Sequence, residues 1–247
     1  MTVLVTTVAI PNPLLGEWFP KGAERLSKSL LDSIGTPHDF QLGMRVFDKP
    51  PLNTPDLKED RMYTGYIAKP YALRDALQHC DIAILCDASF YAVRDISPLV
   101  DHIQRVGYYL CRNGSTVGEW TSDNCLRYFD LERDEVMGMA DVSSYCVGIN
   151  KHDLKALRFA DAWCQHSNRQ TIPGFHTNQP HKNRRSRNPG WVSQERRVKG
   201  HRHDQSVLSI LAHQMGLLDW CNRPMFTTYK GHEDETTVLV CEGMEGR

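Results

Sequence analysis

The fold is decided by the stretch Asp81-Ile-Ala-Ile-Leu-Cys86, which runs directly into Asp87-Ala-Ser89. A short apolar run bounded by polar residues is typical of a buried strand. A carboxylate that follows such a strand leaves the sheet at its carboxyl end, where open α/β sheets bind ligands and where Mg²⁺ or Mn²⁺ finds hard oxygen atoms. The stretch predicts an α/β protein with a binding site at Asp87. On position alone, a turn in which Asp87 caps the next segment is an equal alternative.

Strand and helix patterns alternate on both sides of this stretch. The alternation predicts one α/β domain over residues 1–247, with a mostly parallel, Rossmann-like central sheet and helices on both faces. Besides the strand that precedes Asp87, the expected strands are Thr2–Ile10, Phe40–Phe47, Tyr108–Arg112, Tyr145–Asn150 and Thr236–Cys241. The expected helices are Ala23–Ile34, Pro70–Cys80, Ser97–Val106, Asn124–Phe129, Asp153–His166 and Asp204–Met215.

The composition is that of an ordinary globular protein. The chain has 247 residues, of which 40% are hydrophobic and 24% charged, and this excludes collagen, coiled coil and disorder. No stretch approaches the roughly 20 apolar residues of a membrane span, and the N-terminus resembles a first strand more than a signal peptide. The eight cysteines form no Cys-x-x-Cys pair, so we expect a reducing, cytoplasmic location.

The net charge of −1 conceals a strong asymmetry. Between Ala162 and His203 there are nine Lys or Arg residues and one acid, Glu195. Such a basic segment predicts an anionic partner, such as a phosphate, a nucleoside diphosphate or a nucleic acid backbone. Within it, Gln170–Gly200 has no hydrophobic period, which is typical of a functional loop or of a solvated one. We expect this loop to order over a bound nucleotide, with Trp191 closing the site.

Two further polar motifs are candidates for chemistry. Gly118-Glu-Trp-Thr-Ser-Asp123 gathers two acids and a Trp before a short helix, where Ser122 or Asp123 is equally a helix cap. Gly200-His-Arg-His-Asp-Gln205 opens a longer helix, and a helix N-terminus flanked by Arg and His is suited to anions. His203 is a candidate metal ligand next to a candidate general base, Asp204. The alternative is a polar capping turn.

Three short motifs resemble small glycosyltransferases of the GT-A type. They are Lys69-Pro-Tyr71 with Cys80–Ser89, then Val93-Arg-Asp-Ile-Ser-Pro-Leu99, and finally Arg202-His-Asp-Gln-Ser-Val-Leu-Ser-Ile-Leu211. The resemblance covers roughly Lys69–Gly216 in order. It implies a GT-A-like fold and the transfer of a sugar from a nucleoside-diphosphate donor, a UDP-sugar before others, to a hydroxyl acceptor. Residues 1–110 would then bind the donor, and residues 111–247 the acceptor.

The resemblance also implies roles for individual residues. The catalytic candidates are Asp204 and Asp123, and the metal candidates for Mn²⁺ or Mg²⁺ are Asp87 and His203. Ser89 stands where the family's motif has a second Asp, so Lys69 and the basic segment could neutralise the leaving diphosphate in place of a metal. The expected donor contacts are Thr6, Thr7, Lys69, Asp87, Ala88, Ser89, Trp120 and Arg202. The expected acceptor or phosphate contacts are Arg184, Arg185, Arg187, Trp191, Arg196 and Arg197.

The acceptor and one other class of function remain open. A glycan and a hydroxymethylated base of viral DNA are both compatible with the motifs as acceptors. A nucleic-acid-binding protein without enzymatic activity would use residues 182–202 as its footprint. Acids at the expected mouth of the sheet would repel a phosphate backbone, which favours the transferase. A metal-dependent hydrolase lacks three spaced ligands in this sequence.

Overall fold

The computed structural model describes residues 1–11, 16–33, 39–57, 63–174, 176–178, 192–218 and 225–242. Its centre is a five-stranded sheet in the order β2-β1-β3-β6-β5. β1 pairs in parallel with β2 and β3, while β6 runs antiparallel to both β3 and β5, so β6 alone is reversed in this sheet. The predicted mixed α/β class with a mostly parallel sheet is confirmed. The strands are β1 (Thr2–Val8), β2 (Gln41–Phe47), β3 (Ile82–Cys86), β5 (Tyr108–Thr116) and β6 (Ala140–Asn150).

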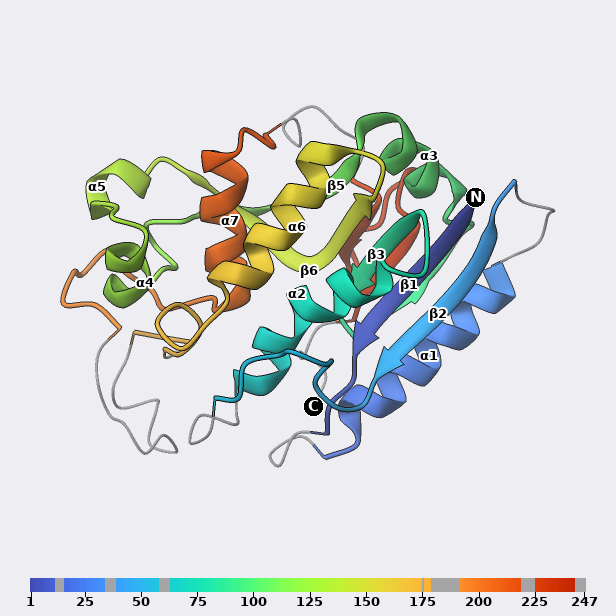
Figure 1. Cartoon of the computed structure of the whole chain (residues 1–247), viewed down its shortest axis with the longest axis horizontal. Coiled ribbons are helices and arrows are strands. Elements are labelled where there is room, and N and C mark those ends of the chain that lie inside the picture. The colour runs from blue at the N-terminus through green and yellow to red at the C-terminus, as the bar shows by residue number, and fades with distance from the viewer. Residues whose placement is uncertain are drawn as a thin grey trace.

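Helices cover both faces of this sheet, as predicted. α2 (Thr64–Ala76), α6 (Leu154–His166) and α7 (Asp204–Gln214) form one layer, which lies in front of the sheet in Figure 1. α1 (Trp18–Ser33) and α3 (Ser97–Val106) pack on the other face. β3 is buried on both sides because its side chains alternate: Ala83 and Leu85 join the core under α2, while Ile84 joins the core under α1 and α3.

A second, three-stranded sheet in the order β4-β8-β7 brings residues 239–242 next to the turn after β3. Its strands are β4 (Phe90–Ala92), β7 (Thr227–Tyr229) and β8 (Leu239–Cys241). The Glu242 amide donates to the Ser89 carbonyl at 3.1 Å, which fixes the C-terminal strand against the turn after β3. The sequence did not predict β4, β7 or the short helix α5 (Arg133–Val136), because three or four residues are too few to establish a period.

Several predicted boundaries are wrong, and the helix that carries Lys69 matters most. It was expected at Pro70–Cys80, yet α2 runs from Thr64 to Ala76 with Pro70 inside it. Proline inside a helix removes a hydrogen bond at a cost of about 3 kcal/mol. Ile67 and Ala68 are fully buried in the preceding turn, and their burial offsets that cost.

The strands β5 and β6 are longer than predicted because their polar ends pair with each other. Thr116 lies opposite Ala140, well beyond the apolar stretches that indicated these strands. The expected end of α3 is confirmed, since Gly107 caps it with a φ of 95°. In the parts of the chain that the structure covers, we find no helix with the length and apolar character to cross a membrane.

The order of the strands creates a crevice where a ligand can bind. From β1 the chain passes through α1 to β2, and then crosses back through α2 to β3 on the other side of β1. The connections therefore diverge at the carboxyl ends of β1 and β3, and such a switch point is where open α/β sheets bind ligands. Thr6 lies opposite Leu85 near these ends, and Asp87 directly follows β3.

Candidate functional site

A cavity of about 710 Å³ opens at the carboxyl end of β3. It is walled by the start of α1, the middle of α2, the turn after β3, the centre of β6, the start of α7 and the small sheet. Both signs of charge face it in equal number. Its described Lys, Arg, Asp and Glu residues are Lys69, Asp87, Arg202, Asp204, Lys230 and Glu242.

One ammonium group bridges two carboxylates in this cavity. Lys69 Nζ lies 2.6 Å from Asp87 Oδ1 and 3.5 Å from Asp204 Oδ2. The three side chains come from α2, from the end of β3 and from the start of α7. Burial by itself would lower the pKa of Lys69, but the charges of Asp204 and Asp87 outweigh it and raise that pKa. Lys69 is therefore a fixed cation.

Asp204 is an acid held away from solvent. It is only 1% exposed, and its burial raises the pKa to about 6, although Lys69 and the Ser144 hydroxyl act in the opposite direction. Asp204 Oδ2 has no hydrogen-bond partner among the described residues besides its ion pair with Lys69. An acid with a pKa near neutrality is suited to taking up a proton.

The backbone before Asp204 adopts a conformation that favours glycine. His203 has φ 53° and ψ −118°, and a non-glycine residue there indicates local strain. Its ring contacts Tyr66 with the centroids 4.3 Å apart, and its Nδ1 donates to the Ile172 carbonyl at 2.9 Å. Burial holds the pKa of His203 well below its usual value, so the imidazole is neutral. These contacts fix the turn that directs Asp204 into the cavity.

Arg202 is a cation without an acidic partner among the described residues. Its guanidinium lies over the Trp120 ring, 3.9 Å from the centroid, and its Nη1 donates to His176 Nε2 at 2.9 Å. Burial, with a smaller effect from Arg202, lowers the pKa of His176 to about 4, so the imidazole is neutral and its Nε2 can accept from Arg202. Arg202 Nε is buried, and no hydrogen-bond partner is found for it in the described part of the chain. Such an arginine is suited to an oxyanion.

The structure brings six of the predicted site residues to the cavity wall. These are Lys69, Asp87, Ser89, Arg202, His203 and Asp204. Two other predicted residues support the wall from behind, since Trp120 stacks on Arg202 and Ala88 packs in the turn after β3, close to Gly22 of α1. Thr6 and Thr7 are fully buried at the end of β1, and no described group hydrogen-bonds to their hydroxyls.

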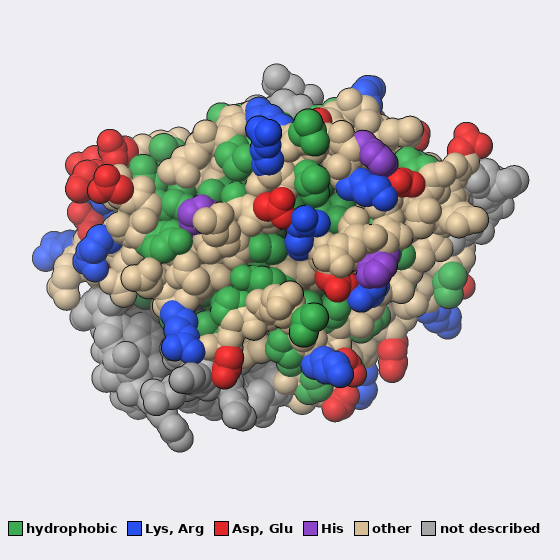
Figure 2. Space-filling view, in the orientation of Figure 1, with side chains coloured by type: hydrophobic (Ala, Val, Ile, Leu, Met, Phe, Trp, Pro, Cys, Tyr) green, Lys and Arg blue, Asp and Glu red, His purple; other side chains and the backbone are tan. Residues whose placement is uncertain are grey.

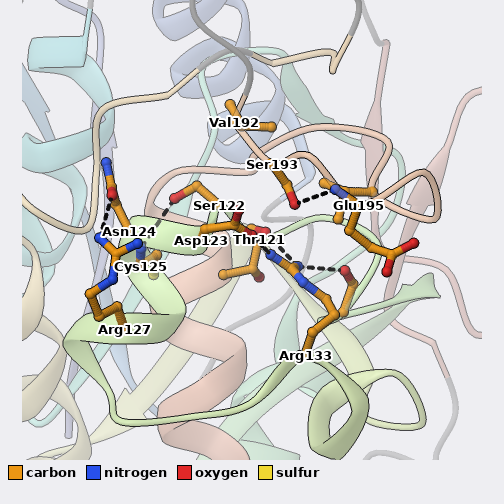
Figure 3. Close-up of polar contacts among 12 residues, drawn as sticks. Thr121, Ser122, Asp123, Asn124, Cys125, Arg127, Arg133, Val192, Ser193 and Glu195 are labelled. Carbon is orange, nitrogen blue, oxygen red and sulfur yellow. Dashed lines mark hydrogen bonds and ion pairs between the residues drawn. The ribbon is translucent and has the colours of Figure 1, made fainter.

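Asp123 lies away from these residues. It is the first residue of α4 (Asp123–Tyr128) and forms an ion pair with Arg133, which also donates to the Gly118 and Thr121 carbonyls at 2.7 Å each (Figure 3). Ser122 caps the same helix by accepting from the Cys125 amide at 3.2 Å. Asp123 is not among the residues that line the cavity. Its contacts hold the loop that carries Trp120.

The basic segment is described only in part. The predicted contacts Arg184, Arg185, Arg187 and Trp191 lie outside the described residues, and so does most of the expected closing loop. Arg196 is exposed, and Arg197 pairs with Asp134 at 2.8 Å and with Glu195 at 3.1 Å. On the face seen in Figure 2, basic and acidic side chains are interspersed. Acidic residues of the protein thus neutralise Arg197, one of the basic side chains expected to bind an anionic partner.

The described residues do not fit a divalent cation at Asp87. In the part of the chain that the structure covers, no three His, Cys, Asp or Glu side chains are grouped as metal ligands. The Lys69 ammonium lies against the carboxylate that would be the first ligand, and Ser89 Oγ lies 3.1 Å from Cys241 Sγ. A metal at Asp87 would therefore meet a like charge.

Sequence reasoning missed part of the cavity wall. Tyr66 stands three residues before Lys69 on one helix face, so an earlier start of that helix would have revealed it. Ser144 lies in β6 just before the predicted strand, and Tyr145 is the first residue of that strand but was not named as a site residue. Lys230 and Glu242 directly follow β7 and β8 of the small sheet. The small sheet is placed against the cavity by contacts between residues far apart in the chain, and local sequence patterns do not predict such contacts.

Two solved structures that resemble this chain carry the name of a glycosyltransferase. Mouse xyloside xylosyltransferase 1 in its apo form has a TM-score of 0.47 and 10% identity, over 87% of this chain and 82% of that one. The apo structure of the WbbM bifunctional glycosyltransferase has a TM-score of 0.46 and 10% identity, over 85% of this chain but only 37% of that one. No family model matches the chain, and no curated protein matches it in sequence. At this level of similarity, function has to be argued from the residues of the cavity.

Proposed function

We propose that the chain is a nucleotide-sugar-dependent glycosyltransferase of the GT-A type, transferring a sugar from a nucleoside diphosphate to a hydroxyl group. One observation carries the proposal: Lys69 contacts both Asp87 and Asp204. All three residues belong to motifs that resemble the family, and Asp204 comes from a motif far along the sequence from the one that holds Lys69 and Asp87. Their meeting in one cavity at the switch point of the sheet is what a donor site of this type requires.

The cavity offers suitable partners for a donor. A volume of about 710 Å³ falls within the usual range of about 300–1,000 Å³ for small-molecule sites. An ammonium group has three N–H donors; Lys69 uses one on Asp87 and forms only a longer ion pair with Asp204, so at least one N–H is left for a phosphate oxygen. Arg202 supplies further donors without an acidic partner among the described residues. These two cations would hold the diphosphate.

Asp204 is the residue we assign as the general base of an inverting transfer. At pH 7 a carboxylate with a pKa of about 6 is mostly ionised and still basic enough to accept the acceptor's proton. As the hydroxyl loses its proton, its oxygen attacks the anomeric carbon and the bond from that carbon to the diphosphate breaks. Lys69 and Arg202 stabilise the charge that develops on the leaving diphosphate.

Isothermal titration with UDP, GDP and their sugars tests the proposal. We expect the wild type to bind at least one of them, with UDP the first choice, and Asp87→Ala to weaken that binding at least 10-fold. Asp161→Ala is the matched control, because it removes an exposed carboxylate of α6 that pairs with Arg74 outside the cavity. The absence of binding by the wild type to every nucleotide would refute the assignment.

The acceptor can be identified once a donor is known. Mass spectrometry of reactions with a panel of glycans and with hydroxymethylated duplex DNA distinguishes the two acceptor classes that the sequence leaves open. A mass increase of one sugar unit on one class identifies the acceptor. Salt-dependent binding of unmodified DNA without any transfer would instead favour a nucleic-acid-binding protein.

A further inference from the structure

We propose that Lys69 takes the place of a divalent cation in this site, so that the transfer proceeds without Mg²⁺ or Mn²⁺. The inference rests on the proposed function for the identity of the leaving group. The position of the Lys69 ammonium does not depend on the proposed function, because it follows from the contacts of Lys69 alone.

The ammonium occupies the position that a metal ion would need. A divalent cation at this end of β3 would draw its protein ligands from Asp87 and from the acid that faces it, Asp204. Lys69 Nζ already lies 2.6 Å from an oxygen of the first and 3.5 Å from an oxygen of the second. A metal could bind both carboxylates only by displacing the Lys69 ammonium, whose side chain is 13% exposed.

The turn after β3 supplies only one carboxylate, Asp87, and its second candidate position holds a serine that is already engaged. Ser89 occupies the second position, is 6% exposed, and has its hydroxyl 3.1 Å from Cys241 Sγ. His203, the other candidate ligand, donates from Nδ1 to the Ile172 carbonyl, which leaves Nε2 as the one ring nitrogen that could bind a metal. Within the described ranges, no third side chain completes a metal site.

Lys69 can do the electrostatic work of a metal ion at the leaving group. It is held on a helix, beside the Tyr66 ring at 5.9 Å from the centroid, between two acids that keep it charged. An N–H of Lys69 that Asp87 does not use can donate to the leaving phosphate oxygen while the bond between that oxygen and the sugar breaks. A cation that is already in place requires no reorganisation during the reaction.

The first test measures metal binding with no nucleotide present. Electron paramagnetic resonance of Mn²⁺ titrated with the wild-type protein should show the ion remaining free at about 0.1 mM protein. Binding at micromolar Mn²⁺ that is lost in Asp87→Asn would overturn the inference. This measurement needs no nucleotide, so it still tests metal binding at Asp87 if no nucleotide binds and the proposed function is wrong.

The second test measures the affinity for the nucleotide that the wild type binds. Adding EDTA or Mn²⁺ should change the wild-type dissociation constant by less than about 2-fold, while Lys69→Met should weaken binding about 10- to 100-fold, as expected for loss of a charge-assisted hydrogen bond. Lys69→Met leaves two carboxylates without a cation, so Lys69→Arg, which keeps the charge, is the second variant and should retain binding. Lys155→Met, whose ammonium donates to the Gly216 carbonyl at an exposed site, is the matched control. A rise in wild-type affinity of 10-fold or more with Mn²⁺, or unchanged binding in Lys69→Met, contradicts the inference.

Discussion

Replacing Asp204 by Asn should make the protein more stable and much less active. The wild-type side chain is buried, and this raises its pKa from 3.8 to about 6. An acid whose pKa is higher in the folded than in the unfolded state binds more protons when folded, so the free energy of unfolding falls as the pH rises through that window. Asn has a similar shape and carries no charge, and it removes this effect.

The size of the effect follows from the shift. A difference of about two pKa units corresponds to about 3 kcal/mol, since each unit is worth about 1.4 kcal/mol. The stability gained by Asp204→Asn should be near zero at pH 4, grow through pH 5 and 6, and level off above pH 7. In the wild type the charges of Asp204 and Asp87 keep Lys69 ionised over this range, and in Asp204→Asn the ion pair with Asp87 remains.

Urea unfolding of the wild type and Asp204→Asn at half-unit steps from pH 4 to pH 8 measures this difference. Taking the difference between the two proteins cancels the titration of histidines that both contain. In the same samples, sugar transfer by the variant should be slower by about 10²- to 10⁴-fold, as expected when a general base is lost. A difference in unfolding free energy that does not vary with pH would refute the assignment of a buried, charged Asp204.

Three further changes test the surroundings of the site. Gly22→Ala would place a Cβ 2.1 Å from the Ala88 carbonyl oxygen, so we expect a loss of about 1–3 kcal/mol in stability by thermal melting together with lower activity; an unchanged melt would contradict that close packing. Arg202→Met should weaken binding of the nucleoside diphosphate about 10- to 100-fold in calorimetry, and equal affinity would mean that this arginine meets another group. Trp163→Phe removes the hydrogen bond from Nε1 to the Asp204 carbonyl at 3.1 Å, and should lower the unfolding free energy by about 1–3 kcal/mol in urea.

The sequence predicted the elements that bury an apolar face and the acids at their ends. The run before Asp87 indicated a buried strand, and the stripe after Asp204 indicated a helix. Both assignments are local, because periodicity and end signals lie within a few residues of each other. Those two acids come close together because α7 packs on β6, the strand that pairs with β3.

Other parts of the site could not be predicted because they depend on distant contacts. Asp123 was a reasonable candidate by composition, but its ion pair with Arg133 depends on how two short helices pack. The start of α2 was missed because Pro70 normally marks a first turn. The small sheet was missed in part because its three strands come from segments up to 150 residues apart, paired by contacts that leave no sequence period.

The central claim is that the cavity around Lys69, Asp87 and Asp204 transfers sugar from a nucleoside diphosphate. The most direct test is to measure release of nucleoside diphosphate from a panel of UDP- and GDP-sugars, with a panel of acceptors, by the wild type and by Asp87→Ala. The account predicts release by the wild type from at least one donor and a loss of at least 100-fold in the variant, with the variant still folded by circular dichroism. No release from any donor, or equal rates in the two proteins, would contradict it.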